Sequence, residues 1–240
     1  MSTAAPATAA TPSKRDAIVD ALMTLAADRP WNDIELIDIA EAAGVSLAEF
    51  RDLFPSKGAV LGAFSRRIDR AVLQGSMEDL KDEPARERLF DVMMRRLDAL
   101  APYKRALRRI VFALREDPLA LAAMNRGAIN SMRFMLAAAG VSTEGPLGGL
   151  KVQGAVVVFS NTMQTWLEDD DPALARTMAR LDRELRRGER WMERAEDFRR
   201  LTAPFRVLAQ ELLEGRRGRR RRRRRERFED EDEGDPAAAI

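Results

Sequence analysis

Apolar residues near the start of the chain recur every three or four positions, which is the spacing of one face of an α-helix. The first set predicts a helix that begins at about Ser13. A second set predicts a shorter helix that stops at Gly44, a residue suited to the left-handed cap of a helix C-terminus. Ser46 and Glu49 then match a capping box, which predicts the start of a third helix. Residues 13–74 therefore read as a helix-turn-helix head followed by a long connecting helix.

Helical spacing continues through residues 75–215 and predicts a larger helical body. Prolines 84 and 118 stand where helices would begin, and a glycine-rich loop follows residue 140. Residues 150–168 are too long for one strand and carry regularly spaced polar residues, so we expect a helix there in spite of three consecutive valines. The sequence thus predicts an all-α protein of about nine to ten helices, with a three-helix head and a C-terminal helical bundle.

The residue types present exclude several kinds of chemistry. The chain has no Cys and no His, which excludes disulfides, imidazole catalysis and the usual zinc and haem sites. No nucleophile–base pair and no phosphate-binding loop stands out, so we predict neither enzyme activity nor a cofactor. Three consecutive acids at 169–171 read as a helix cap rather than as metal ligands, because adjacent carboxylates diverge. We predict no metal site.

Both ends of the chain differ from the rest in composition. Residues 1–12 are rich in Ala, Thr and Pro, and residues 216–240 hold ten arginines and seven acids, so we expect two disordered tails. The remaining residues have 31 basic and 32 acidic groups, so the net charge of +2 comes from the second tail. Its arginine run should attract any polyanion. No apolar run has the length of a signal peptide or a membrane span, and we expect a cytoplasmic protein.

Motifs in the head resemble those of the tetracycline-repressor (TetR-like) family. They are Ile39-Ala40, Ala43-Gly44-Val45-Ser46, Phe50, Phe54-Pro55-Ser56-Lys57 and Leu61. The resemblance covers about the first 70 residues and implies a homodimeric transcription regulator that binds operator DNA and responds to a ligand. The DNA-binding residues it implies are Ser46, Leu47, Ala48, Glu49, Arg51, Asp52 and Lys57, with Lys57 on a phosphate.

The head departs from this family in its charge. Residues 13–70 hold eight basic and ten acidic groups, whereas DNA-binding proteins usually place several cations on the phosphates. In the third helix Glu49 and Asp52 would meet a polyanion, and Arg51 is the residue able to pair with a guanine or a phosphate. Two interpretations stay open. Either the head binds DNA through helix ends and backbone amides, or it has kept the fold without the function.

In TetR-like proteins the body binds an effector and forms the dimer, and the resemblance extends these roles to this chain. Methionines suit adaptable apolar pockets, although they also fill ordinary cores. The pocket for a small apolar effector is assigned to Met93, Leu97, Met124, Met132 and Met163. The dimer interface is assigned to Val156, Phe159, Met163, Trp166, Met178 and Leu181.

A second resemblance lies further along the chain. It rests on Thr165-Trp166-Leu167-x-Asp169, Thr177 and Leu181-Asp182-Arg183-x-Leu185. This run is similar to the C-terminal signature of the ubiquinone-biosynthesis accessory proteins, lipid-binding relatives of the same fold that bind no DNA. The alternative function is therefore a lipid- or isoprenoid-binding accessory protein, with weak membrane or polyanion contact through residues 198–225. A last packing helix of the body explains the same apolar spacing after residue 198.

Overall fold

The computed structural model describes residues 13–75 and 80–194. Every regular element in these ranges is helical, which confirms the predicted all-α class. Eight α-helices, α1 to α8, have both ends inside the described ranges, against the nine or ten predicted. A further helical stretch, residues 175–194, runs up to the limit of the description. Both predicted tails, 1–12 and 216–240, lie outside the described residues.

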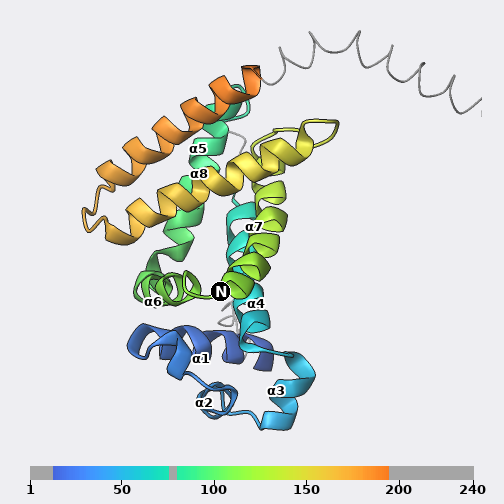
Figure 1. Ribbon diagram of the computed structural model, residues 1–240, viewed down its shortest axis with the longest axis vertical. Coiled ribbons are helices and arrows are strands. Elements are labelled where there is room, and N and C mark those ends of the chain that lie inside the picture. Colours follow the sequence, from blue (N-terminus) through green and yellow to red (C-terminus); the bar gives the residue numbers. More distant parts are fainter. Residues whose placement is uncertain (1–12, 76–79, 195–240) are drawn as a thin grey trace, which may run out of the picture. The chain divides into compact units, whose positions relative to one another are not determined.

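The head consists of three helices grouped around the start of a fourth (Figure 1). They are α1 (Lys14–Asp28), α2 (Leu36–Ala42), α3 (Leu47–Leu53) and α4 (Lys57–Leu73), with the 3₁₀ turn η1 (Trp31–Asp33) between α1 and α2. Gly44 has a φ of +66°, as a left-handed cap requires, and the capping box of Ser46 and Glu49 is formed. Phe50 and Phe54 are buried with Ile18 in the core of the head.

The body contains α5 (Ala85–Leu100), α6 (Lys104–Leu114), α7 (Pro118–Ala138) and α8 (Gly148–Glu168), with the 3₁₀ turn η3 (Ala101–Tyr103) before α6. The C-terminal end of α7 is capped by Arg88, whose Nε donates a 2.8 Å hydrogen bond to the Ala139 carbonyl. Asn161 of α8 donates a hydrogen bond to Glu184, so residues 175–189 pair with α8. The predicted helix over 150–168 is confirmed.

Head and body meet along two sets of helices. α1 and η1 pack on α6, while α4 packs on α5 and α7. The chain divides into two units after Glu189, and both of these junctions lie within the first unit. The predicted boundary at residue 74 coincides with the end of α4, whose C-cap is Gln74. That residues 13–74 and 75–215 form separate domains stays a prediction. None of the helices in the described part of the chain has the length and apolar character needed to cross a bilayer.

Candidate functional site

Helix α3 presents an exposed face beside the turn that follows α2. Phe50 points into the core with 1% of its surface exposed, which leaves the other faces of the short helix outside. Leu47 is 48% exposed, and Ala48, Arg51 and Asp52 are also exposed. The implied DNA-binding residues on α3 therefore occupy one accessible surface.

Glu49, the acid expected to repel DNA, is engaged within the protein. Its carboxylate accepts a 2.8 Å hydrogen bond from the Ser46 amide and forms a 2.5 Å ion pair with Lys14 of α1. The hydrogen bond from Lys14, followed by those from Ser46, lowers the pKa of Glu49 to about 2. Glu49 thus links α3 to α1 through an ion pair. Asp52 is the acid on the α3 face that has no partner among the described residues.

The start of α1 brings two cations next to α3. Arg15 donates a 3.2 Å hydrogen bond to the Leu53 carbonyl, and its guanidinium lies 4.3 Å from the centre of the Phe54 ring. Lys14 and Arg15 both remain exposed. Neither residue is among the predicted DNA contacts, because more than 30 residues separate them from α3 and only the packing of α1 brings them there.

Lys57 occupies the first position of α4, but its ammonium points inward. It donates hydrogen bonds of 2.5 Å to the Trp31 carbonyl and 2.9 Å to the Ile34 carbonyl, and it lies 4.4 Å from the centre of the Trp31 ring. Burial lowers the pKa of Lys57. Two of its three N–H donors are thus used to hold the α1–α2 connection, and the implied phosphate contact stays a prediction.

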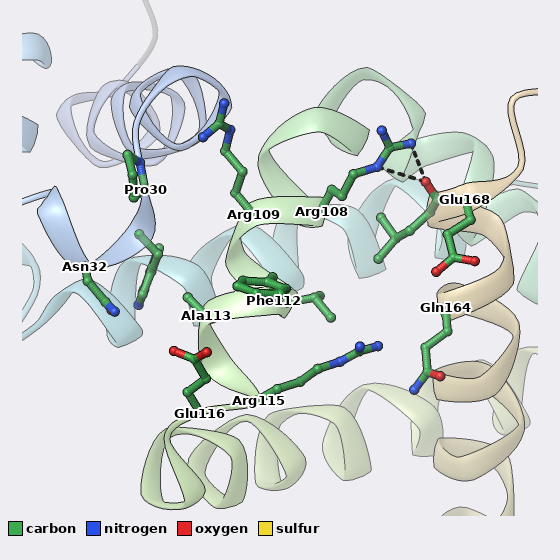
Figure 2. A pocket seen from close by; sticks show the side chains of 13 residues that line it. Pro30, Asn32, Arg108, Arg109, Phe112, Ala113, Arg115, Glu116, Gln164 and Glu168 are labelled. Carbon is green, nitrogen blue, oxygen red and sulfur yellow. Dashed lines mark hydrogen bonds between the residues drawn. The ribbon is translucent and has the colours of Figure 1, made fainter.

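The residues assigned to an effector pocket do not all share one environment. Met93, Leu97 and Met132 are buried in the core, Met163 is partly buried and Met124 is exposed. A different cavity of about 540 Å³ opens between η1, α6 and the end of α8 (Figure 2), and none of these five residues lines it. The methionine pocket therefore stays a prediction. In the described ranges, no group of three or more Asp or Glu side chains is placed to hold a metal ion.

Comparison with solved structures identifies the architecture. A TetR transcriptional regulator from Nitrosomonas europaea ATCC 19718 matches 74% of this chain and 99% of its own length, with 25% sequence identity and a TM-score of 0.59. The chain has a TetR-like fold. A TetR transcriptional regulator from Rhodococcus sp. RHA1 matches 73% of this chain and 94% of its own length, with 17% identity and a TM-score of 0.55. No family model and no curated protein sequence matches the chain.

Most residues assigned to the dimer interface of this TetR-like fold are already covered within one protomer. Val156, Phe159, Trp166 and Leu181 are buried, Met163 is partly buried and Met178 is exposed. The same helix α8 carries other apolar side chains on its outer face, where Leu150 is exposed and Val157 is 49% exposed. The assigned interface stays a prediction, and Leu150 and Val157 are accessible residues that it did not include.

The residues that resemble the signature of the ubiquinone accessory proteins have a packing role in this structure, and the resemblance itself stays a prediction. Asp169 is buried and accepts hydrogen bonds from the Thr177 amide at 2.9 Å and the Thr177 hydroxyl at 2.7 Å. The Thr177 hydrogen bonds lower the pKa of Asp169. Trp166 and Leu181 fill the core. These residues fix the turn between α8 and the helical residues 175–194, and the predicted membrane segment 198–225 lies outside the described residues.

Proposed function

We propose that this protein is a ligand-responsive transcriptional regulator that binds operator DNA as a homodimer. The observation that carries the proposal is the exposed face of α3, the second helix of a helix-turn-helix, on a TetR-like fold. Two solved structures of this fold with TM-scores of 0.59 and 0.55 are TetR transcriptional regulators. The face is exposed in the described part of the chain and holds side chains long enough to reach base edges.

The charge of this face is less unfavourable than its composition indicates. Glu49 is paired with Lys14, so its negative charge is partly neutralised in the folded protein. Arg51 is exposed on α3 and is the candidate for a base contact, since a guanidinium pairs with two acceptors of guanine. Arg15 flanks the face from α1 and is a candidate for a phosphate contact. Asp52 then disfavours bases that present an acceptor close to it.

The homodimer would form through α8 and the helical residues that follow it. Leu150 and Val157 are exposed about one turn before and one turn after Gly154, a residue whose missing side chain allows a second helix to approach closely. Met178 adds an exposed apolar side chain from the paired helical stretch. A two-fold dimer of this kind places two α3 helices on half-sites separated by roughly 34 Å, one turn of DNA.

The test is the preference of the full chain for DNA from upstream of its own gene over an unrelated duplex of equal length. Affinity for both duplexes is measured by fluorescence anisotropy at several salt concentrations, because the arginine run binds both equally and cancels in the ratio. Arg51→Ala should reduce the preference by about 1–3 kcal/mol. Arg126→Ala, an exposed arginine of α7, is the matched control. Equal affinity of the unmodified chain for both duplexes would rule out the regulator.

A further inference from the structure

The cavity beside α6 lies at the joint between head and body. Its walls come from three places, namely Pro30, Trp31 and Asn32 at η1, the last two turns of α6, and the C-terminal end of α8. Its volume of about 540 Å³ falls within the range of small-molecule sites, roughly 300–1,000 Å³. It is separate from the predicted methionine pocket. A molecule bound there would touch the head and the body at the same time.

The centre of the cavity is apolar. Phe112 of α6 is 68% exposed, an unusual position for a phenylalanine, and its ring stands in the middle of the site (Figure 2). Trp31 lines the head side, and Leu167 lines the α8 side. A flat apolar group placed against Phe112 would remove this ring from water, which is a favourable change.

The charges around Phe112 favour an anion. Arg109 lies one helical turn before Phe112 and Arg115 one turn after it, and neither has a hydrogen-bond or ion-pair partner among the described residues. Arg109 is partly buried, and its guanidinium has no counter-charge among the described residues, so an anion in the cavity would supply one. Arg108 is already used, because it donates two hydrogen bonds to the Leu167 carbonyl at the end of α8.

Two carboxylates also line the cavity, Glu116 and Glu168. Both are exposed, so water solvates them and their lack of a protein partner costs little. The helix ends of α6 and α8 add partial negative charge, which the bonded Arg108 offsets at α8. The site is therefore positive on the Arg109 side, one turn back from the end of α6.

From these features we infer that the cavity binds a small organic anion, with its carboxylate or other acidic group on Arg109 and a flat apolar part on Phe112. The chemistry is that of an aromatic or similarly flat carboxylate. Gln164, which lines the site from α8, supplies an amide able to hydrogen-bond a polar substituent of the ligand.

The ligand would act on the head through Trp31, a role that rests on the proposed regulatory function. One side of this residue lines the cavity, and its carbonyl and ring hold the Lys57 ammonium at the start of α4. Displacement of Trp31 by a ligand would loosen the two carbonyl bonds of Lys57 and change how α4 and α3 are held. Trp31 thus belongs both to the anion site and to the contacts that hold the start of α4, the helix that follows α3.

The test uses calorimetric titration of the full chain with naphthalene-2-carboxylate and with the protonated amine 2-(aminomethyl)naphthalene. We expect one saturable site for the carboxylate and weaker binding of the amine. Arg109→Ala and Phe112→Ala should each weaken the carboxylate by about tenfold or more, the scale of one charge-assisted hydrogen bond or one aromatic contact. Arg126→Ala is the control, because it also removes one positive charge but lies outside the cavity and leaves the arginine tail in place. It should change the affinity less than about twofold.

Absence of saturable binding would overturn the site, as would an equal loss in Arg109→Ala and Arg126→Ala. If Arg109→Ala fails to fold, Glu116→Gln at an exposed position tests whether the cavity binds an anion. Removal of this nearby negative charge should strengthen carboxylate binding by about threefold. An unchanged affinity there would count against the anion.

The titration needs no DNA, so the site and the regulator can fail separately. Loss of DNA preference with intact carboxylate binding would remove the proposed function and leave the site. If both activities exist, saturation with the carboxylate should change the affinity for the preferred duplex by about threefold or more, and an unchanged affinity would overturn the link through Trp31.

Discussion

Arg96 on α5 and Asp69 on α4 form an ion pair inside the protein, where both side chains are almost fully covered. Ser131 of α7 donates a 2.7 Å hydrogen bond to the same carboxylate oxygen, and the Ser65 hydroxyl of α4 accepts one of 3.3 Å from Arg96. The guanidinium also lies 5.4 Å from the centre of the Phe159 ring of α8. The helix that carries the head is therefore fixed to three body helices by one charged cluster.

Removal of the acid from this cluster should destabilise the protein strongly. Asp69→Ala leaves the buried Arg96 without its counter-charge, and we expect the free energy of unfolding to fall by about 3–5 kcal/mol. The measurement is denaturant unfolding followed by circular dichroism. Asp28→Ala breaks the Arg105–Asp28 ion pair, whose side chains are 70% and 67% exposed, and it should cost at most about 1 kcal/mol. Similar losses in the two variants would contradict the role assigned to the buried pair.

Stability at acidic pH should depend on Glu49. Its folded pKa of about 2 lies below the ordinary value of 4.5, so the carboxylate stabilises the fold above pH 4.5. That contribution is lost as the pH falls from 4.5 towards 2. Glu49→Gln should therefore show a shallower fall in unfolding midpoint over this range. In Lys14→Ala, an NMR titration should find the pKa of Glu49 raised, since the hydrogen bond from Lys14 is its largest cause. A pKa that stays at about 2 would show that Ser46 alone is sufficient.

The two glycines that begin α8 should respond differently to alanine. A Cβ at Gly148 would lie 1.7 Å from the Thr143 carbonyl oxygen, so Gly148→Ala must displace the loop before the helix. We expect it to cost more than about 3 kcal/mol, the scale of a severe packing clash. A Cβ at Gly149 meets nothing within 4 Å, and Gly149→Ala should be neutral or stabilise the helix by up to about 1 kcal/mol. Thermal unfolding of the two variants measures this difference in stability. Equal midpoints would show that the loop before α8 moves freely to make room for the Cβ.

Lys57→Ala should affect stability as well as DNA binding. The substitution removes the ammonium donor from the carbonyls of Trp31 and Ile34, although the Trp31 carbonyl keeps a hydrogen bond from the Ile34 amide. We expect a loss of about 1–3 kcal/mol in the free energy of unfolding. DNA affinity should fall by a similar factor for preferred and unrelated duplexes, because any contact of Lys57 is with phosphate. Unchanged stability would contradict the role given to the two carbonyl bonds, and unchanged DNA affinity would contradict the phosphate contact.

Local signals predicted the elements of the head well. The capping box of Ser46 and Glu49 and the left-handed Gly44 depend on neighbouring residues, so they could be read from sequence order. The pairs that define the site are separated by long stretches of chain. Lys57 lies 26 residues from Trp31, and Lys14 lies 35 residues from Glu49. Such contacts depend on how whole helices pack.

Arg96 is a residue whose position its type alone does not predict. An arginine in an amphipathic helix is expected on the polar side, but position 96 shares the face of Met93 and Leu97, both of which are buried. Its charge is tolerated there because Asp69 arrives from α4. Met124 is the opposite case, since it was predicted to line an apolar pocket but is exposed among the described residues.

Asp169 connects three helices through one residue. Its side chain holds Thr177, while its backbone carbonyl accepts a 2.5 Å hydrogen bond from Lys104 at the start of α6, and Lys104 also lies 5.2 Å from the centre of the Trp166 ring in α8. A rotation of α6 would therefore strain this turn as well as the cavity at its other end. In the proposed dimer, a ligand that moves α6 would therefore also act on this turn and on the interface helices that it joins.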